Sequence, residues 1–161
     1  MSGANDETDL GEFIQTAAEA VERSIRPEAG AVMTCPVSHP PAETQPLPAA
    51  VAKKAVEQKS PAEWAYERII LYIKNFEEQL ASEEEVAMGF TGSSAGTLHI
   101  QGMGYFAPDL VAFYGVDENG SRTQMVQHVS QLNVLLRAVP KPAEKEEAAR
   151  IGFKLQSALE D

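Results

Sequence analysis

The chain of 161 residues has a single cysteine, Cys35, and only 13 Lys and Arg against 24 Asp and Glu. One cysteine excludes an internal disulfide, which is typical of a protein from a reducing compartment. The net charge of −11 is negative both before and after residue 60. An acidic surface repels nucleic-acid phosphates and anionic membranes, so we expect no nucleic-acid partner.

Long apolar runs are also absent. No run approaches the roughly 20 residues that a helix needs to span a bilayer. The N-terminal residues MSGANDETDLGEF lack the basic start and apolar stretch of a secretion signal. We therefore expect a cytoplasmic protein with no membrane partner.

Aromatic residues are scarce in the first 60 positions, where Phe13 is the only one of the eleven, whereas six of the ten prolines lie there. Such a segment cannot bury enough apolar area to offset the entropy of ordering it. The sequence therefore predicts an N-terminal arm over 1–25, a Pro-rich disordered linker over 26–59, and a folded domain over 60–161.

Within the arm, residues 9–25 have the spacing of an amphipathic helix. A helix of this length is marginal alone in water, so it either frays or buries its apolar stripe on the domain, a second copy or a partner. One hypothesis is a docking arm whose contact residues are Leu10, Phe13, Ile14, Ala17 and Val21, with Ile25 on the same face.

The domain opens with Ser60-Pro61-Ala62-Glu63, which combines an N-cap serine, a proline at the first helical position and a possible capping box. The helix is expected to run to about Ser82. Its main apolar stripe is Ala65, Ile69, Ile73, Phe76 and Leu80, widened by Trp64, Leu71 and Tyr72.

Four strands are predicted after this helix, over 86–90, 97–105, 110–115 and 122–128. In the second strand, alternation places Leu98 and Ile100 on one face and His99, Gln101 and Met103 on the other. Gly102 and Gly104 indicate a bulge or a close backbone approach. Residues 91–96, TGSSAG, form a hairpin loop, and Asn119-Gly120 favours a tight turn between the last two strands.

After His128 the apolar residues recur at intervals of three and four, which predicts a short helix capped by Ser130 and ended by Pro140. Pro142 is expected to begin a last helix whose buried stripe is Ala148, Ile151, Leu155 and Leu159. The predicted fold class is α+β: a four-stranded antiparallel meander with helices packed on one face, in the order α-β-β-β-β-α-α. A disordered tail with one short amphipathic helix precedes it.

Few residues are arranged for chemistry. Cys35 and His39 have metal-ligand spacing, but no second pair completes a site, so we expect no metal and no cofactor. His99 and His128 lie on strands and Asp109 in a turn. No strained strand-to-helix elbow presents a nucleophile to them. We interpret the histidines as structural residues and Asp109 as part of an Asx turn, while a hydrolase or transferase that uses them stays an alternative.

Uncharged polar residues are concentrated where the last strand ends. They are either caps of that corner or the lining of a polar pocket or oligomer interface. These residues are Gln124, Gln127, His128, Ser130, Gln131 and Asn133.

Four blocks of the domain resemble a small bacterial family known as a domain of unknown function. They read PAEWAYERIILYIKNFEEQL, YFAPDLVAFYGVDENG, QMVQHVSQLNVLLRAV and ARIGFKL, and QHVSQLNVLL is the most distinctive phrase. The resemblance covers about residues 60–157. It implies a bacterial, cytoplasmic protein and a domain boundary near Ser60, and it brings no activity, cofactor or catalytic residue.

Three functions are compatible with these patterns. The first is a non-enzymatic interaction module that forms a homo-oligomer through its sheet or helix faces, with the arm as a docking element. The second is a protein that binds or sequesters a small, nucleotide-like ligand by way of residues 91–96 and the polar cluster. The third is the hydrolase or transferase that uses His99 or His128 with Asp109.

Overall fold

The structure is a computed structural model that describes residues 39–90 and 96–161 of the chain. By its internal contacts the chain divides into two units, residues 1–36 and residues 37–161, and the description below concerns the second. The predicted arm with its helix over 9–25, the first part of the predicted linker and Cys35 all lie outside the described residues.

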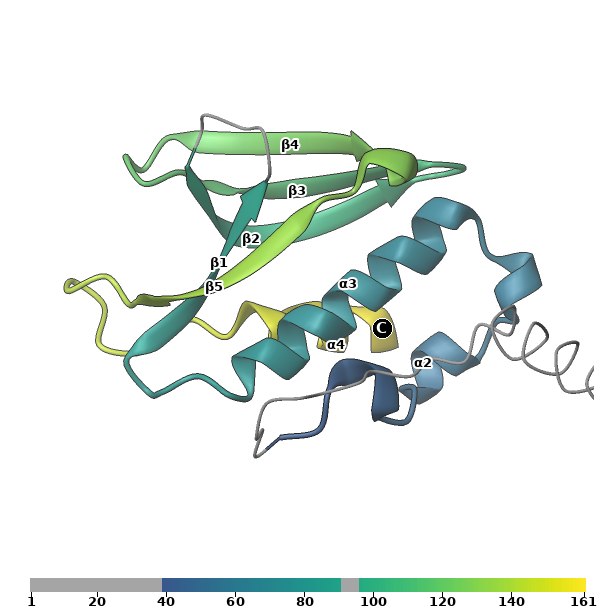
Figure 1. Ribbon diagram of the computed structural model, residues 1–161, viewed down its shortest axis with the longest axis horizontal. Helices are drawn as coiled ribbons and strands as arrows, with labels where there is room; N and C mark the ends of the chain where they lie inside the picture. The colour runs from purple at the N-terminus through teal and green to yellow at the C-terminus, as the bar shows by residue number, and fades with distance from the viewer. Residues whose placement is uncertain (1–38, 91–95) are drawn as a thin grey trace, which may run out of the picture. The chain divides into compact units, whose positions relative to one another are not determined.

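The predicted α+β class is confirmed, but the antiparallel sheet has five strands rather than four (Figure 1). Its order is β4-β3-β2-β1-β5, and the bounds of the first four strands agree with the predictions to within two residues. The strands are β1 (Glu84–Phe90), β2 (Thr97–Phe106), β3 (Leu110–Val116), β4 (Arg122–His128) and β5 (Val134–Pro140).

Strand β5 shows that the helix predicted between Ser130 and Pro140 is wrong. Val134 lies opposite Phe90 and Leu136 opposite Met88, so β5 pairs along the whole of β1. In a short apolar run, periodicity cannot separate a strand from a helix. The pairing decides the outcome, because β1 would otherwise leave a row of unpaired backbone groups at the edge of the sheet.

The sheet is strongly curled. Strands β4 and β5 are its two edges, yet only residues 129–133 join them, and three of these form the 3-10 helix η3 (Val129–Gln131). A link of this kind spans about 16 Å, whereas the edges of a flat five-stranded sheet lie about 19 Å apart. Only two residue pairs join β1 to β2, and Figure 1 shows β1 and β5 running obliquely to the other three strands.

Helix α3 (Pro61–Glu77) packs on the concave face of this sheet. The predicted start is confirmed, because Ser60 Oγ accepts the Glu63 N–H at 3.1 Å. The Glu63 carboxylate accepts from Lys54 at 2.9 Å. Ile70 and Ile73 are the most deeply buried large side chains of the helix, whereas Trp64 and Tyr72 of the predicted apolar face are more than 40% exposed.

A β-bulge lies in β2, as the two glycines predicted. Ile100 lies opposite Gly115 and Gly102 opposite Tyr114, so Gln101 is an extra residue without a partner on β3. Strands β2 and β3 approach each other closely at this point. A Cβ added to Gly115 would lie only 2.1 Å from the His99 carbonyl oxygen.

The bulge reverses the alternation of side chains along the rest of β2. Met103 lies opposite the fully buried Phe113 and packs against the core. The prediction that Met103 shares a face with His99 and Gln101 is therefore wrong. A period of two holds only where no residue is inserted.

Helix α4 (Ile151–Glu160) begins nine residues after the predicted start at Pro142. The Glu77 carboxylate of α3 accepts the N–H groups of Gly152 and Phe153 at 2.9 and 3.2 Å, so it caps the first turn of α4. The two helices cross closely there, because a Cβ on Gly152 would lie 2.7 Å from the Lys74 Cα. Of the predicted stripe, Ile151 and Leu155 are buried.

This buried cap predicts a pH dependence. Burial raises the pKa of Glu77, although the two N–H groups that it accepts lower it in part. The folded state therefore holds the proton more tightly than the unfolded chain. This contribution to stability is complete below the unfolded pKa and is lost as the pH rises through the raised pKa.

We expect the free energy of unfolding of the wild type, minus that of Glu77→Gln, to fall as the pH rises above the ordinary pKa of a glutamate, about 4.3. Glutamine keeps one acceptor and does not titrate, so the variant isolates this group. Urea denaturation at several pH values measures the difference. A difference that stays constant or grows with pH would contradict the assignment.

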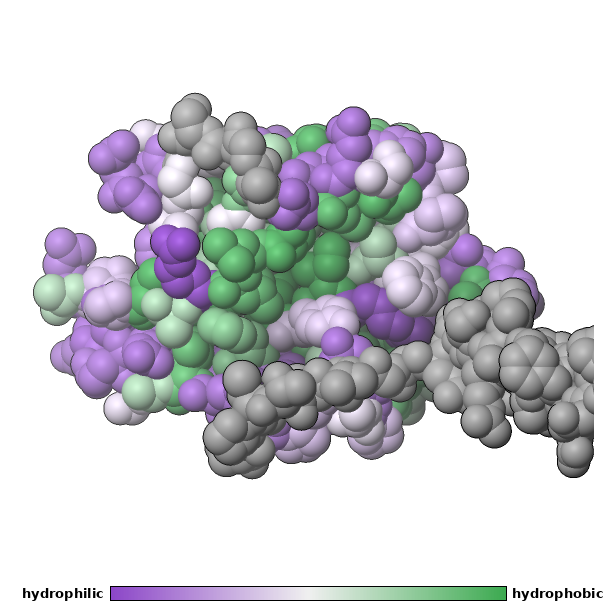
Figure 2. All heavy atoms as spheres, in the orientation of Figure 1, coloured by the Kyte–Doolittle hydropathy of each residue, from purple (hydrophilic) through white to green (hydrophobic). Residues whose placement is uncertain are grey.

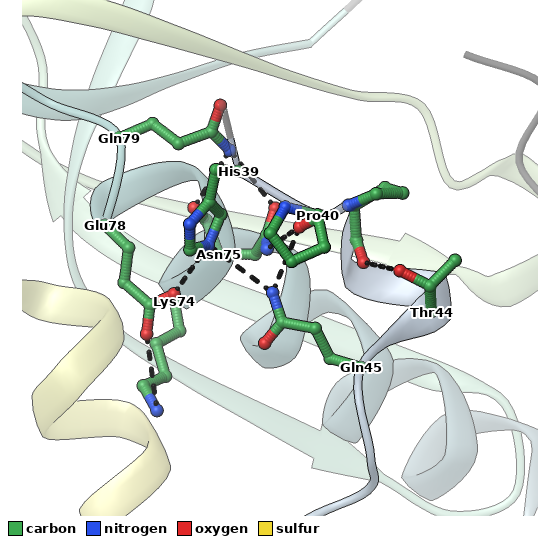
Figure 3. A network of polar contacts seen from close by, with 9 residues as sticks. His39, Pro40, Thr44, Gln45, Lys74, Asn75, Glu78 and Gln79 are labelled. Atoms are coloured by element: carbon green, nitrogen blue, oxygen red, sulfur yellow. Dashed lines mark hydrogen bonds and ion pairs between the residues drawn. The ribbon is translucent and has the colours of Figure 1, made fainter. Parts of the chain in front are cut away.

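Residues 39–59, which we call the strap, are folded against α3 and contain η1 (Ala42–Thr44), α2 (Ala49–Ala52) and η2 (Val56–Gln58). Figure 3 shows the polar network at its first end. Asn75 Nδ2 donates to the Pro40 carbonyl at 2.9 Å, and Gln45 donates to the same oxygen at 3.1 Å. His39 Nε2 lies 2.9 Å from a carboxylate oxygen of Glu78.

The strap is also fixed further along. Tyr72 donates to Glu43 at 2.6 Å, a hydrogen bond that raises the pKa of Tyr72 to about 12. Lys59 Nζ, on a side chain 1% exposed, donates to the Val51 carbonyl at 2.5 Å and to Glu67 at 2.6 Å. The prediction of a disordered linker is therefore wrong for residues 39–59, because α3 supplies partners that the strap's own composition does not reveal.

Candidate functional site

The structure brings part of the predicted polar cluster together at the corner between β4 and β5. Ser130 and Gln131 lie in η3, and Asn133 directly precedes β5. Gln124 and His128 are exposed on β4, whereas Gln127 lies opposite the buried Val111. The cluster is thus divided between the two faces of the sheet.

Asp109, His128 and Ser130 form a hydrogen-bonded chain at this corner. His128 Nε2 lies 2.8 Å from Asp109 Oδ2, and His128 Nδ1 lies 2.7 Å from Ser130 Oγ. The Ser130 N–H donates to the same Nδ1 at 3.1 Å, so in the neutral ring Nδ1 is the acceptor and Nε2 carries the proton. The Val129 N–H also donates to the Asp109 carbonyl, which ties the corner to the start of β3.

These distances resemble a nucleophile, a base and an orienting acid, but the chemistry favours a cap. The lone pair of Nδ1 accepts the backbone N–H of Ser130, so it is already committed to holding the first turn of η3. The side chains of His128 and Asp109 are 44% and 40% exposed, without the water-excluded surroundings that activate a nucleophile. We interpret the three residues as a lock on the corner.

His99, the other histidine on the sheet, lies at the opposite end of β3. It pairs with Val116, whereas His128 pairs with Leu110, six residues earlier, so about 20 Å of strand separates them. The two histidines therefore do not act at one site. The His99 side chain makes no hydrogen bond with any residue that the structure describes.

His99 lines a cleft with a volume of about 700 Å³. The volume suits a small ligand. The lining, however, carries more carboxylates than lysines, which disfavours a phosphate-bearing ligand. Its residues include His99, Gln101, Glu85, Asp117, Glu118, Glu144, Lys145 and Lys154.

Most of these acids already have structural partners. Asp117 accepts the N–H groups of Asn119 and Ser121 at 2.9 Å and so closes the predicted tight turn. Glu118 accepts from the Thr97 hydroxyl at 2.8 Å, and Glu85 accepts the Ala149 N–H at 2.7 Å. The cleft therefore gives little support to the nucleotide-like ligand that the sequence left open.

The two edges of the sheet differ in their side chains. On β4 the exposed residues are Arg122, Gln124, Val126 and His128, of which three are polar or charged. On β5 Leu135 is 51% exposed and Arg137 is the only charged residue. Polar and charged side chains disfavour pairing at an edge strand, so β5 is the more apolar of the two edges and, among the described residues, its outer side has no strand partner. The sequence predicted a helix for residues 130–140, so it did not predict an edge strand at β5.

Residues 39–90 and 96–161 contain no group of three or more His, Cys, Asp or Glu that could hold a metal ion. No helix within those ranges is long and apolar enough to cross a membrane.

The fold and its exposed features define a small acidic α+β domain whose notable surfaces are an open sheet edge and shallow depressions. A family of unknown function, DUF6173, matches residues 55–154, so the chain belongs to this family. The family resemblance read from the sequence is thereby confirmed. The match leaves the first part of the strap outside it. Neither the curated proteins nor the solved structures compared with the chain contain a match.

Proposed function

We propose that this protein is a non-enzymatic interaction module that self-associates through the free edge of β5. The observation that carries the proposal is a seven-residue apolar edge strand, VLLRAVP, with one charged residue and no proline before its last position. An edge strand presents unpaired N–H and C=O groups, and a second strand satisfies them.

An antiparallel pair of β5 strands has a favourable register. When Leu136 lies opposite Leu136 of a second copy, Val134 faces Ala138 and Leu135 faces Arg137. Apolar side chains then meet across the pair, and the arginine lies beside an aliphatic neighbour. Pairing centred on Arg137 would instead place two like charges opposite each other, which is unfavourable. The Leu136 register joins two sheets about a two-fold axis, the commonest symmetry of homo-oligomers.

Two matched variants test the proposal. Leu135→Lys adds a positive charge to β5, and Val126→Lys adds the same charge to β4, where the valine is 54% exposed. We expect Leu135→Lys to weaken self-association about tenfold or more and Val126→Lys to leave it unchanged. Light scattering across a concentration series measures both, and circular dichroism confirms that each variant folds.

A wild-type mass that stays at the 17.4 kDa of one chain at micromolar concentration would overturn the proposal. Equal effects of the two lysines would overturn the choice of β5. We further propose that residues 9–25 add a contact to a second copy or to a partner protein. A chain that lacks residues 1–25 then associates more weakly than the full chain, and an unchanged association constant would remove the arm from the interface.

A further inference from the structure

We propose that His128 is a proton switch for the β5 edge: protonation of its ring removes the cap of η3 and weakens the association of two copies. This inference rests on the self-association proposed above and adds its regulation. It concerns the corner between β4 and β5, where the hydrogen-bonded chain through Asp109, His128 and Ser130 lies directly before the edge strand.

The corner determines where β5 begins. Only residues 129–133 separate β4 from β5, and three of them form η3. Two backbone N–H groups hold this link: that of Ser130 donates to His128 Nδ1 at 3.1 Å, and that of Val129 donates to the Asp109 carbonyl at 2.9 Å. Loss of the Ser130 bond therefore loosens the link at the end that leads into β5.

Only a neutral imidazole can accept the Ser130 N–H. In the neutral ring Nδ1 has a lone pair, and Nε2–H donates to Asp109 Oδ2 at 2.8 Å. In the cation both ring nitrogens carry protons, so Nδ1–H and the Ser130 N–H become two donors that face each other. Nδ1–H then donates to Ser130 Oγ, 2.7 Å away, and the backbone N–H loses its acceptor. Histidine is the side chain that changes charge between about pH 5 and 8, and the 44% exposed side chain of His128 takes up the proton without unfolding of the domain.

Asp109 is the charged group that faces the imidazole, at 2.8 Å from Nε2. The other charged groups on the elements packed against η3 have contacts of their own. They are Lys59 and Lys54 of the strap, paired with Glu67 and Glu63 of α3, and Arg68, whose guanidinium lies over the Trp64 ring. The response of the corner to a proton therefore depends on Asp109 and on the cap.

Asp109 attracts the cation and opposes the release of the cap, but its effect is small. It accepts from Nε2–H in both charge states, so protonation strengthens an existing contact and adds no new one. Both side chains of the pair are at least 40% exposed. Exposed ion pairs contribute little and are screened by salt, whereas a backbone cap is not. At high salt the lost cap outweighs the gain at Asp109.

Release of the cap reaches the proposed interface through the first residues of β5. Figure 2 shows apolar surface over β5 and between β5 and α3. Val134, the first residue of β5, lies opposite Phe90, and in the Leu136 register it meets Ala138 of a second copy. A second strand pairs with an ordered edge at a lower entropic cost than with a loosened edge. Two copies therefore separate more readily when His128 is protonated.

The test compares the dissociation constant of the full chain at about pH 7.5 and about pH 5.5, in about 0.5 M salt, by light scattering across a concentration series. We expect the constant to rise about threefold or more at the lower pH. General charge effects predict the opposite, because protonation reduces the net charge of −11 and with it the repulsion between copies. The direction of the change therefore separates the switch from overall titration.

His128→Asn is the matched variant, because the asparagine oxygen accepts the Ser130 N–H in an Asx turn and does not titrate. Its dissociation constant should stay the same or fall at the lower pH. His99→Asn removes a histidine whose side chain makes no hydrogen bond with a described residue, and it should keep the wild-type response. Circular dichroism confirms that each variant folds at both pH values.

The protection of the Ser130 amide against hydrogen exchange measures the cap separately. It should fall at the lower pH in the wild type and stay the same in His128→Asn. A wild-type dissociation constant that stays the same or falls on acidification, or an equal rise in His128→Asn, would overturn the switch and leave the self-association intact. A chain that stays a single copy at both pH values would overturn the self-association, and the switch with it.

Discussion

Gly115→Ala is expected to destabilise the domain by about 3 kcal/mol or more. A Cβ at this position would lie 2.1 Å from the His99 carbonyl oxygen and 3.1 Å from the Ile100 Cα. Both atoms belong to the backbone of β2, so no side-chain rotation can relieve the clash. Strands β2 and β3 must therefore separate at the bulge. Phe113, a fully buried core residue, lies on β3 two residues before Gly115.

Gly102→Ala is the matched control, because Gly102 lies on the other side of the same bulge. The nearest atom to its added Cβ is a ring carbon of Tyr114 at 3.9 Å, an ordinary contact. We expect a change of less than about 1 kcal/mol. Chemical denaturation measures the free energy of unfolding of both variants. Equal free energies would contradict the close approach of β2 and β3 at Gly115.

Lys59→Ala should destabilise the domain by about 3–5 kcal/mol, because it removes one partner of a buried ion pair. Glu67 is only 7% exposed and would keep a buried charge without its cation. The Val51 carbonyl would lose the same donor. The strap would then be released from α3 at this end, and proteolysis within residues 39–59 should become faster.

Lys54→Ala provides the comparison. Lys54 also reaches from the strap to a glutamate of α3, at 2.9 Å from Glu63, but its side chain is 47% exposed. Exposed ion pairs contribute little, so denaturation and proteolysis should hardly change. If Lys59→Ala behaved like Lys54→Ala, the strap would not be part of the folded unit.

The sequence was sufficient for the elements whose signals are local. Ser60 and Pro61 marked the start of α3, and Asn119-Gly120 marked the turn between β3 and β4. Gly102 and Gly104 indicated the bulge. In each case the residues that fix the backbone lie within a few positions of the structure that they produce.

The missed elements depend on partners distant in the sequence. Helix α4 is capped by Glu77, 75 positions before Gly152, so the glutamates after Pro142 gave a misleading start. Strand β5 exists because β1 pairs with it, although its apolar spacing also fits a helix. The strap is ordered by Asn75 and Glu67 of α3, and no composition argument could anticipate those contacts.

The candidate sites follow the same rule. The sequence singled out His128 and Asp109 for their chemistry and Ser130 as a cap and a member of the polar cluster. The structure joins the three residues as a cap at a corner. The sequence showed which kinds of side chain are present, but it could not show that the side chains of His128 and Asp109 are exposed to solvent. The apolar edge of β5 appears only after the fold is built, because it is defined by the strand pairing that neighbouring elements leave unsatisfied.

Hydrogen–deuterium exchange of the two edge strands at increasing protein concentration tests the central claim most directly. If copies join through β5, the amides of residues 134–140 gain protection as the concentration rises, and those of residues 122–128 stay the same. Concentration-independent exchange in both strands, or new protection confined to β4, would contradict an association edge at β5.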